Sequence, residues 1–478
     1  MLKKIKAASV GTSQNLIVHG DNLEALKALM PYYVGKVKCI YIDPPYNTGN
    51  EGWVYNDKVN SPKIKQWLEK TVKLDDLTRH DKWLCMMYPR LKLLRDLLAD
   101  DGAIFVSIDD NEHCNLRGVM DEIFGEENFI TTFIWKKKGT VTSTAKNVSI
   151  ITEYIICYQK SGAVFSKRLL EDAIYSYTDE RGTYRRVGIE TSDAGQYARE
   201  TMKFEILGVK PHSGRRWKIG KAKAEELEKN NYLELSNGTV YIKKYEGEEI
   251  REAVFNNLID EQGTSQSART EVNNEIFGVP ETFTTPKPIS LIKHLLKMII
   301  GQDDIVLDSF AGSGTTGHAV LDLNKEDGGN RKFILVEMED NVAKDITAER
   351  VKRAIKKYGY KDGFEYCELD KPLFNERGQI EETCDFKQFA TYIYFTETQT
   401  NIDHAKVKAN YIGEQNGTEY YLIYKEPHKN DLDKSFLKKL EKTDSKKIVY
   451  ADRCTLDESE LAEYNVVFKQ IPYEVKVY

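Results

Sequence analysis

The sequence predicts an α/β fold, and three observations carry that prediction. Short apolar strands alternate with amphipathic helices from residue 16 to residue 135, and the alternation resumes at residue 281. In that second stretch a glycine-rich turn joins a buried strand to a helix. Such alternation favours a mostly parallel sheet with helices on both faces. A chain of 478 residues, 41% hydrophobic and 30% charged, has the composition of a folded protein of about three domains.

The first half of the sheet is expected before residue 136. Apolar runs predict strands over 15–19, 37–43 and 103–109. Helical spacing predicts a capped helix over 21–30 and a long one over about 80–99, which Gly102 is expected to end. Asp110 and Asn111 are expected to open another helix that ends near Gly125.

The rest of the chain divides into three further parts. From about 136 to 280 the alternation breaks down, which predicts an irregular insert; it resumes with a helix within 284–299 and strands over 303–308 and 332–338. After 370 a small separate α/β domain is expected, with strands near 389–395, 419–424, 447–451 and 464–478 and helices near 432–442 and 456–463. The resulting domain boundaries are 1–135, 136–280, 281–370 and 371–478.

Several classes of protein are disfavoured. No segment approaches the roughly 18 consecutive apolar residues of a membrane helix, and the N-terminus lacks the apolar core of a secretory signal. The seven cysteines show no CxxC spacing and no accompanying histidine cluster, so neither a disulfide framework nor a zinc site is expected. We therefore expect a cytoplasmic protein without a metal site.

Positive charge is concentrated in one internal segment. The whole chain carries a net charge of −6, yet residues 131–230 hold 19 basic and 12 acidic residues. A basic segment on an otherwise acidic protein indicates a contact with a polyanion.

The segment 304–320, DIVLDSFAGSGTTGHAV, has the pattern of a cofactor-binding turn. Gly312, Gly314 and Gly317 satisfy G-x-G-x-x-G between a strand and a helix, where glycine lets the backbone approach a ligand closely. Glu337 follows twenty residues after Gly317, at the end of the next strand, where a carboxylate accepts hydrogen bonds from ribose hydroxyls. The spacing fits an adenosine-containing cofactor and leaves open a nicotinamide dinucleotide or S-adenosylmethionine.

The segment YIDPPYNTGN, residues 41–50, favours the second cofactor. Asp43 ends a buried strand, and Pro44 and Pro45 hold the following backbone extended and remove two N–H donors. The Asp43 carboxylate and the Pro44 carbonyl can accept both hydrogens of an exocyclic amine, while Tyr46 stacks on the planar ring. These interactions suit an amine that attacks a sulfonium methyl group. A nicotinamide oxidoreductase would leave this segment unexplained.

With these motifs the sequence resembles the amino-methyltransferases of DNA. DPPY and FAGSG correspond to that family's acceptor and cofactor motifs, and their order resembles the circularly permuted beta group. Five segments resemble the modification subunits of Type III restriction–modification systems: DPPYNTGN, DKWLCMMYPRLKLLRDLL, GAIFVSIDDNE, TTPKPISLI and FKQIPYEV. The resemblance implies a permuted, Rossmann-like methyltransferase sheet, an inserted target-recognition region and a C-terminal domain for protein contacts. DPPY suggests adenine N6, with cytosine N4 as the alternative.

The resemblance also implies roles for individual residues. Asp43, Pro44, Pro45 and Tyr46 become the catalytic and base-holding residues. Around the methionine end of S-adenosylmethionine it places Phe310, Gly312 and Gly314, with Asp308 just before them and Thr315 just after, and it gives Glu337 the ribose. The segment Thr285, Pro286, Lys287, Pro288 is expected to close over the methionine moiety, and Asp21 to contact the adenine end. No metal is required.

Recognition of double-stranded DNA is expected from the insert. Three basic clusters are candidates for contacts with phosphates or base edges: Lys136, Lys137 and Lys138; Arg185 and Arg186; and Arg215 and Arg216 beside Trp217. Any single lysine here is more simply a solvated side chain, whereas the SGRRWK loop is a stronger candidate.

Two further expectations concern partners. The sequence lacks the G-x-x-x-x-G-K-[ST] phosphate loop, so a restriction subunit with nuclease and ATPase functions would have to be a separate chain. The family resemblance suggests a homodimer. A subunit that recognises DNA and tethers a nuclease without methylating it is the alternative from another functional class.

Overall fold

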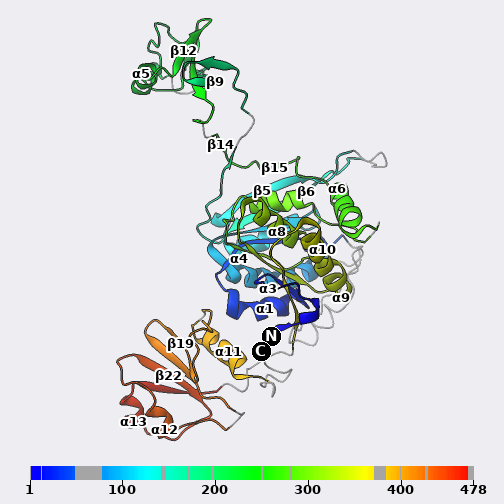
Figure 1. Ribbon diagram of the computed structural model, residues 1–478, viewed down its shortest axis with the longest axis vertical. Coiled ribbons are helices and arrows are strands. Elements are labelled where there is room, and N and C mark those ends of the chain that lie inside the picture. The colour runs from blue at the N-terminus through cyan, green and yellow to red at the C-terminus, as the bar shows by residue number, and fades with distance from the viewer. Residues whose placement is uncertain are drawn as a thin grey trace. The chain divides into compact units, whose positions relative to one another are not determined.

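The structure is a computed structural model that describes residues 2–11, 13–48, 78–140, 147–169, 173–194, 199–248, 251–279, 282–370, 384–398, 400–425 and 429–471. The chain divides into two compact units, residues 1–165 with 256–478, and residues 166–255 (Figure 1). Among the described residues, no helix combines the length and the apolarity needed to cross a bilayer.

The larger unit is built on a ten-stranded sheet, which confirms the predicted α/β fold. Its strand order is β1-β18-β2-β17-β16-β3-β4-β6-β5-β15. The central strands β18, β2, β17, β16, β3 and β4 run parallel, while β6 is antiparallel to both β4 and β5. In chain order the strands are β1 (Leu2–Lys4), β2 (Leu16–His19), β3 (Val37–Ile42), β4 (Leu98–Ile108), β5 (Phe129–Lys136), β6 (Thr152–Gln159), β15 (Leu258–Ile259), β16 (Ile305–Asp308), β17 (Lys332–Glu337) and β18 (Glu365–Leu369).

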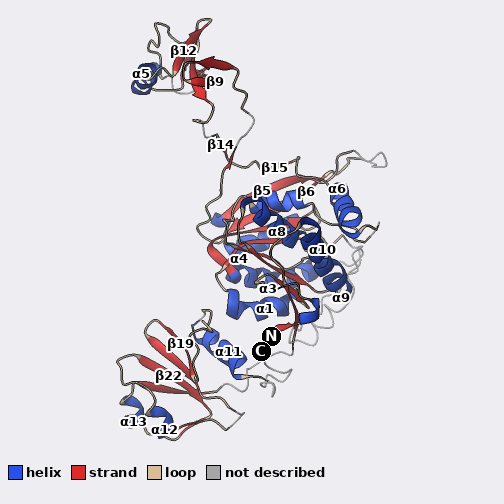
Figure 2. Cartoon of the chain, in the orientation of Figure 1, coloured by secondary structure: helices blue, strands red, loops and turns tan. Residues whose placement is uncertain are grey.

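Helices cover both faces of this sheet. Ile334 and Val336 of β17 pack in one core cluster with α1, α3 and α4, whereas Phe333 and Leu335 face Gly317 of α8. Alternate residues of a strand point to opposite faces, so the two helix groups lie on opposite sides. Figure 2 distinguishes the helices from the strands. The helices are α1 (Asn22–Tyr33), α3 (Arg79–Leu97), α4 (His113–Phe124), α6 (Ser265–Arg269), α7 (Ile289–Leu296), α8 (Thr315–Asp327), α9 (Asp340–Val342) and α10 (Glu349–Tyr358), with π-helical turns at Thr270–Phe277 and Ala343–Ala348.

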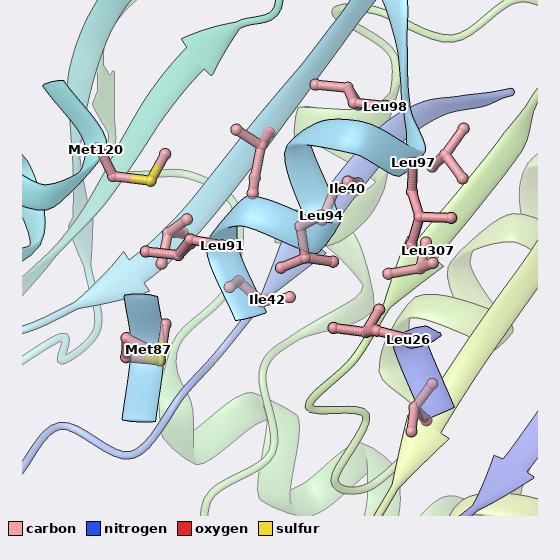
Figure 3. Packing of buried hydrophobic residues seen from close by; sticks show 14 of the residues in the cluster. Leu26, Ile40, Ile42, Met87, Leu91, Leu94, Leu97, Leu98, Met120 and Leu307 are labelled. Carbon is pink, nitrogen blue, oxygen red and sulfur yellow. The ribbon is translucent and has the colours of Figure 1, made fainter. Parts of the chain in front are cut away.

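Figure 3 shows the core on the α1–α3–α4 face. Met87, Leu91 and Leu94 of α3 recur at helical spacing and belong to one buried cluster with strand residues such as Ile40 and Leu307. These leucine and methionine side chains are fully buried, as are the strand residues they contact. The packing fixes the ends of β3 and β16, from which the site is built.

Two boundaries in this region differ from expectation. Helix α3 ends at Leu97 and β4 begins at Leu98, so Gly102 lies within the strand and does not end the helix. A Cβ at Gly102 would lie 2.8 Å from the Lys38 carbonyl oxygen, which explains the glycine by strand packing. Helix α4 begins at His113 with Glu112 as its N-cap residue, after a turn in which the Asp109 carboxylate accepts the Asn111 N–H.

The smaller unit has its own sheet and core. Strands β12 (Leu233–Ser236), β13 (Thr239–Tyr245), β9 (Gly182–Gly188) and β8 (Tyr177–Asp179) form a four-stranded sheet in that order, and β10 (Glu190–Ser192) pairs with β11 (Arg215–Trp217). Helix α5 spans Lys221–Lys229, and β7 (Arg168–Leu169) pairs with β14 (Glu252–Ala253). This unit is narrower than the expected 136–280 insert, because β6 and β15 fall in that range and complete the large sheet.

The C-terminal residues form a second four-stranded sheet with its own apolar clusters. It consists of β19 (Tyr411–Gln415), β20 (Thr418–Leu422), β22 (Lys446–Ala451) and β24 (Val466–Gln470), with helices α11 (Phe386–Thr398), α12 (Lys434–Leu437) and α13 (Glu458–Ala462). The strand predicted over 389–395 is wrong. Asp385 and Gln388 form a reciprocal cap, and Phe389, Ile393 and Tyr394 are buried at helical spacing, so the segment is helical. Residues 472–478 of the strand predicted over 464–478 lie outside the described residues.

Candidate active site

The corner after β3 presents a carboxylate and a phenol beside each other. Asp43 follows the last strand residue, and its Oδ1 accepts the Tyr46 hydroxyl at 2.8 Å. Pro44 is buried, and the Pro45 carbonyl accepts the Trp83 indole N–H at 2.7 Å. The two prolines and the indole therefore fix the backbone that carries Asp43 and Tyr46. Gly49 and Asn50 of the predicted motif lie outside the described residues.

A buried carboxylate anchors the far side of this corner. Asn47 adopts a left-handed conformation with φ of 60°, and its side-chain amide donates to the Arg79 carbonyl and to Glu112. Glu112, fully buried, also contacts His80 Nδ1 at 2.6 Å and accepts Asn115 at 2.7 Å. These bonds hold the chain where it turns sharply after Tyr46, because a left-handed residue other than glycine needs support from its surroundings.

Lys287 lies against the acceptor corner. Its ammonium donates to Asp43 Oδ2 at 2.6 Å and to the Tyr46 hydroxyl oxygen at 3.0 Å. Burial lowers the pKa of Lys287, but the carboxylates of Asp43 and Glu153 more than offset this and raise it above its ordinary value. The sequence placed Lys287 among the cofactor-closing residues, whereas the structure places its charged end on the catalytic candidates. Thr285 of the same segment is exposed and lines the adjoining cavity.

Glu153 completes this cluster and was not predicted from the sequence. It lies on β6, with Oε2 3.3 Å from the Tyr46 hydroxyl and 3.6 Å from Lys287 Nζ, while Oε1 accepts Lys137 at 2.9 Å. Burial raises the pKa of the Glu153 carboxyl group. The positive charges of Lys287 and Lys137 lower it by more than burial raises it, so the net pKa is below the ordinary value. Burial, with Asp43 and Glu153, raises the pKa of Tyr46 well above its usual range, which keeps the phenol protonated. Glu153 belongs to no short sequence motif, so the sequence alone does not indicate its role.

These groups line one cavity of about 510 Å³. Its wall combines the two acidic and two basic groups above with a third carboxylate, further basic side chains, hydroxyl groups and apolar side chains. The lining residues are Asp43, Pro44, Pro45, Tyr46, Thr48, Asp109, Lys137, Lys138, Glu153, Ser265, Arg269, Thr284, Thr285, Pro286 and Lys287. A planar ring with a polar edge fits such a wall, and the basic side chains suit the phosphates of a nucleotide.

The glycine turn after β16 is organised by two carboxylates. Asp308 ends the strand, and its oxygens accept the Phe310 N–H at 3.1 Å and the Thr316 hydroxyl at 2.6 Å. Glu337, at the end of the neighbouring β17, accepts the Gly312 N–H at 2.8 Å. Gly314 is left-handed with φ of 76°, and a Cβ there would lie 3.1 Å from the Thr347 carbonyl oxygen. The turn therefore requires glycine and is tied to both strands.

Asp308 is directed into the protein and holds the turn from within. Burial raises its pKa from 3.8 to about 7, against the lowering effect of its Thr316 and Phe310 hydrogen bonds. Between pH 4 and 7 the folded chain therefore binds more protons at this site than the unfolded chain does. Stability contributed by the protonated group is lost as pH rises through this range.

This shift predicts that Asp308→Asn becomes more stable relative to the wild type as pH increases. The asparagine mimics the protonated acid and removes a relative penalty of up to about 4 kcal/mol between pH 4 and 8. Denaturant unfolding of both proteins across this range measures the difference. Parallel stability profiles would contradict the raised pKa.

The remaining candidate cofactor-binding residues are Phe310 and Thr315 in the glycine turn and Asp21 at the start of α1. Phe310 is half-buried and packs on the main core. The Thr315 hydroxyl is buried and donates to the Lys287 carbonyl at 3.1 Å, so it joins the glycine turn to the 285–288 segment. Asp21 caps α1 by accepting the Glu24 N–H, and its other oxygen lies 3.3 Å from Arg90. Thr315 thus supports the turn through its own hydrogen bonds.

The glycine turn fits the nucleoside and methionine portions of S-adenosylmethionine. Ser309 is buried, and its hydroxyl has no hydrogen-bond partner among the described residues, so a polar acceptor or donor remains available in the turn. The Glu337 carboxylate stands at the strand end where a ribose is held in such folds. Burial raises the pKa of Glu337 despite the Glu339, Gly312 and Met338 N–H groups, which lower it. Among described residues, no group of three or more His, Cys, Asp or Glu side chains could hold a metal ion.

The basic residues predicted to contact DNA lie in different surroundings. Lys137 is paired with Glu153, Lys138 lines the same cavity, and Lys136 ends β5. In the smaller unit, Arg186 forms an ion pair with Glu234 and lies 3.9 Å from the Tyr177 ring centroid. Arg185 lines an open pocket beside it.

Trp217 does not serve as a surface aromatic residue, which corrects its prediction as a DNA contact. Its side chain is fully buried in the smaller unit, where the indole donates to the Phe204 carbonyl at 2.7 Å. Arg215 before it is exposed, and Arg216 is partly exposed with Asp193 at 3.5 Å. Arg215 therefore remains at the surface and Arg216 partly so, whereas Trp217 belongs to the core of the smaller unit.

Comparison with known proteins gives a consistent result. The family model for N6 and N4 methyltransferases, described as DNA methylase, matches residues 37–349. The Mod subunit of the Type III restriction-modification enzyme StyLTI of Salmonella typhimurium is 35% identical over 82% of this chain and 62% of its own length. The Mod subunit of EcoP15I of Escherichia coli is 30% identical, over 81% of this chain and 70% of that subunit.

A relative of a second kind is also similar. The Type II methyltransferase M.KpnI of Klebsiella pneumoniae is 32% identical over 70% of this chain and 82% of its own length. The chain therefore spans less than two thirds of the Salmonella subunit but most of the Klebsiella enzyme.

Proposed function

The chain belongs to the DNA methylase family of N6 and N4 methyltransferases, and from that premise we propose that it methylates adenine N6 in double-stranded DNA. The methyl donor is S-adenosylmethionine, as the glycine turn and Glu337 support. The observation that carries the proposal is the convergence of Asp43 and Tyr46 in one cavity, at the end of the strand next to β16.

The cofactor end is formed by the turn after β16. Glu337 and the backbone of Gly312 would hold the adenosine part, with the Ser309 hydroxyl close by. When bound, S-adenosylmethionine supplies an electrophilic methyl group. Gly312 and Gly314 have left-handed backbones with φ of 47° and 76°, which glycine adopts without strain, and this conformation shapes the turn that would hold the ligand.

The acceptor end receives a base that has left the DNA stack. An amine in a duplex cannot reach the Asp43 carboxylate, so the nucleotide must be extruded at a cost of a few kcal/mol. Stacking on Tyr46 would return roughly 1–3 kcal/mol. The Asp43 carboxylate and the Pro44 carbonyl would accept the amine hydrogens and orient the nitrogen for attack.

Asp43 also provides the electrostatic stabilisation for transfer. Positive charge develops on the amine nitrogen as it bonds to carbon, and a carboxylate fixed at the site stabilises that charge. The side chain is only 24% exposed, so water screens it weakly. The proton can depart after the methyl group has moved, and a strong base is unnecessary.

The choice of adenine over cytosine rests on the aspartate that leads the DPPY motif, which resembles the adenine-N6 form. Cytosine N4 presents a similar exocyclic amine and is the alternative. A subunit that tethers a nuclease without methylating DNA would have no need for the ordered Asp43–Tyr46–Lys287 cluster.

Modification mapping tests this function. The chain is expressed in a bacterial host without DNA methylation, beside the Asp43→Ala variant, and the DNA is sequenced by long reads. We expect N6-methyladenine at one short motif, absent from the variant. Methylation of a single strand would support the Type III relationship, N4-methylcytosine would shift the target base, and unmodified DNA would favour the tethering function.

We infer that the smaller unit contacts DNA through Arg215 and its neighbour Arg216. Both residues lie on β11 next to the buried Trp217; Arg215 is exposed, and Arg216 is partly exposed with Asp193 3.5 Å away. Replacing both with alanine should weaken DNA binding and lower the slope of log affinity against log salt by about two if both contact phosphates. Fluorescence anisotropy over a series of salt concentrations measures both quantities.

A matched variant makes this test specific. Lys223→Ala with Lys229→Ala removes two exposed positive charges from α5 of the same unit. Equal losses in the two double variants would indicate a general charge effect and would count against a contact at Arg215 and Arg216.

We further propose that the chain acts in a restriction–modification system of the bacterial cytoplasm. Support comes from the likeness to Mod subunits, whose names place them in Type III enzymes. A separate restriction subunit and a homodimer are the assemblies consistent with that relationship. Size-exclusion chromatography with light scattering determines the number of copies.

A further inference from the structure

Lys287 occupies both groups that the proposed function assigns to the target base. Its ammonium is 2.6 Å from Asp43 Oδ2 and 3.0 Å from the Tyr46 hydroxyl oxygen. It also lies 5.2 Å from the centre of the Tyr46 ring. A base amine that approaches Asp43 therefore meets a cation already bound there.

That ion pair opposes methyl transfer in two ways. Lys287 uses acceptor capacity of Asp43, and its positive charge cancels much of the field that would stabilise a cationic amine. Both side chains are mostly shielded from water, so the interaction is strong. Lys287 must therefore leave Asp43 before transfer, yet an unpaired ammonium in this cavity would be costly.

Glu153 offers the displaced ammonium another acceptor. Its Oε2 is 3.6 Å from Lys287 Nζ, slightly beyond hydrogen-bond distance. Because β6 is fixed between β4 and β5, the backbone directs Glu153 toward Lys287, and its other oxygen is paired with Lys137 at 2.9 Å. A shift of the Lys287 side chain within the cavity is enough to exchange one carboxylate for the other.

We propose that Glu153 is a positioning residue that takes the Lys287 ammonium from Asp43 when the target base enters. This inference rests on the proposed function. The exchange keeps Lys287 paired throughout and restores the charge of Asp43 for the amine. Glu153 thus acts through Lys287 and touches neither base nor cofactor.

The test uses the full chain and four proteins: wild type, Glu153→Gln, Lys287→Met and the double variant. One readout is single-turnover methyl transfer. The second readout is a ratio of two DNA affinities, both measured without cofactor. It divides the affinity for a duplex with a mismatched target adenine by the affinity for a duplex with an abasic target site. The recognition sequence comes from modification mapping, or from selection of bound duplexes with each adenine replaced in turn.

We expect Glu153→Gln to slow transfer by about tenfold and to weaken binding of the adenine duplex only, since an abasic site does not compete for Asp43. In the Lys287→Met background, Glu153→Gln should have no further effect. The double variant should therefore transfer methyl groups faster than Glu153→Gln alone and show a higher ratio of adenine to abasic affinity. Additive losses would overturn the exchange, because they would mean that Glu153 acts independently of Lys287.

Lys137→Met supplies the matched control. It removes the other cation held by Glu153, and it should leave the ratio of adenine to abasic affinities near that of the wild type. A ratio lowered as much as in Glu153→Gln would show that Glu153 acts through Lys137 and would overturn the proposal. A wild type that binds its duplex without transferring methyl groups would refute the proposed function, while the affinity ratios would still decide the exchange.

Discussion

Replacing Asp43 with alanine should lower the rate of methyl transfer by at least about a thousandfold, while leaving the cofactor affinity nearly unchanged. The variant loses the amine acceptor and the fixed negative charge that stabilises the cationic nitrogen. It also removes the carboxylate nearest to Lys287, so the ammonium charge beside the reacting amine is no longer balanced by Asp43. Single-turnover assays and calorimetric titration with S-adenosylmethionine separate the two effects.

The control for this variant is Asp109→Ala. Asp109 also lines the cavity, but its carboxylate accepts hydrogen bonds from Asn111 and belongs to a surface turn. We expect its replacement to retain most activity. Substantial turnover by the Asp43 variant would remove Asp43 from the reaction.

Replacing Glu337 with alanine should weaken binding of S-adenosylmethionine by about a hundredfold or more. The carboxylate is expected to hold the ribose, and charged hydrogen bonds of this kind contribute ~1.5–3 kcal/mol each. The variant also releases the Gly312 N–H, which Glu337 holds at 2.8 Å, and so loosens the turn. Isothermal titration with S-adenosylmethionine and with its demethylated product measures the loss.

Glu339→Ala is the matched control for Glu337. It removes an exposed carboxylate two residues away on the same connection, outside the bonds that hold the turn. Its affinity should stay close to the wild-type value. A Glu337 variant that binds both ligands normally would place the ribose elsewhere.

The candidate residues that the sequence indicated within continuous segments also lie close together in the structure. Asp43 and Tyr46 share one short turn, and Glu337 follows the glycines at a spacing set by one helix and one strand. Local chemistry such as two successive prolines or a left-handed glycine leaves a readable pattern. The family membership is confirmed by the comparison, and the α/β sheet by the structure.

Other contacts depend on pairings that no segment reveals. Glu153 reaches Lys287 only because β6 enters the sheet antiparallel to β4, and Lys287 is brought to Asp43 from 244 positions away. Trp217 looked like a surface ring because two arginines precede it, but the apolar side chains that bury it come from other parts of the smaller unit. Tertiary packing decides such cases over local composition.

The pairing of β7 with β14 has a consequence for how this protein can diversify. The chain enters the smaller unit at Arg168–Leu169 and leaves at Glu252–Ala253, and these two short strands lie side by side. Neighbouring strands are about 5 Å apart, so the unit starts and finishes at nearly one point. A different segment with adjacent ends could be exchanged there while every strand of the ten-stranded sheet kept its partners. On the proposed role of the smaller unit in DNA contact, recombination at this junction would change the DNA contact and leave the large sheet as it is.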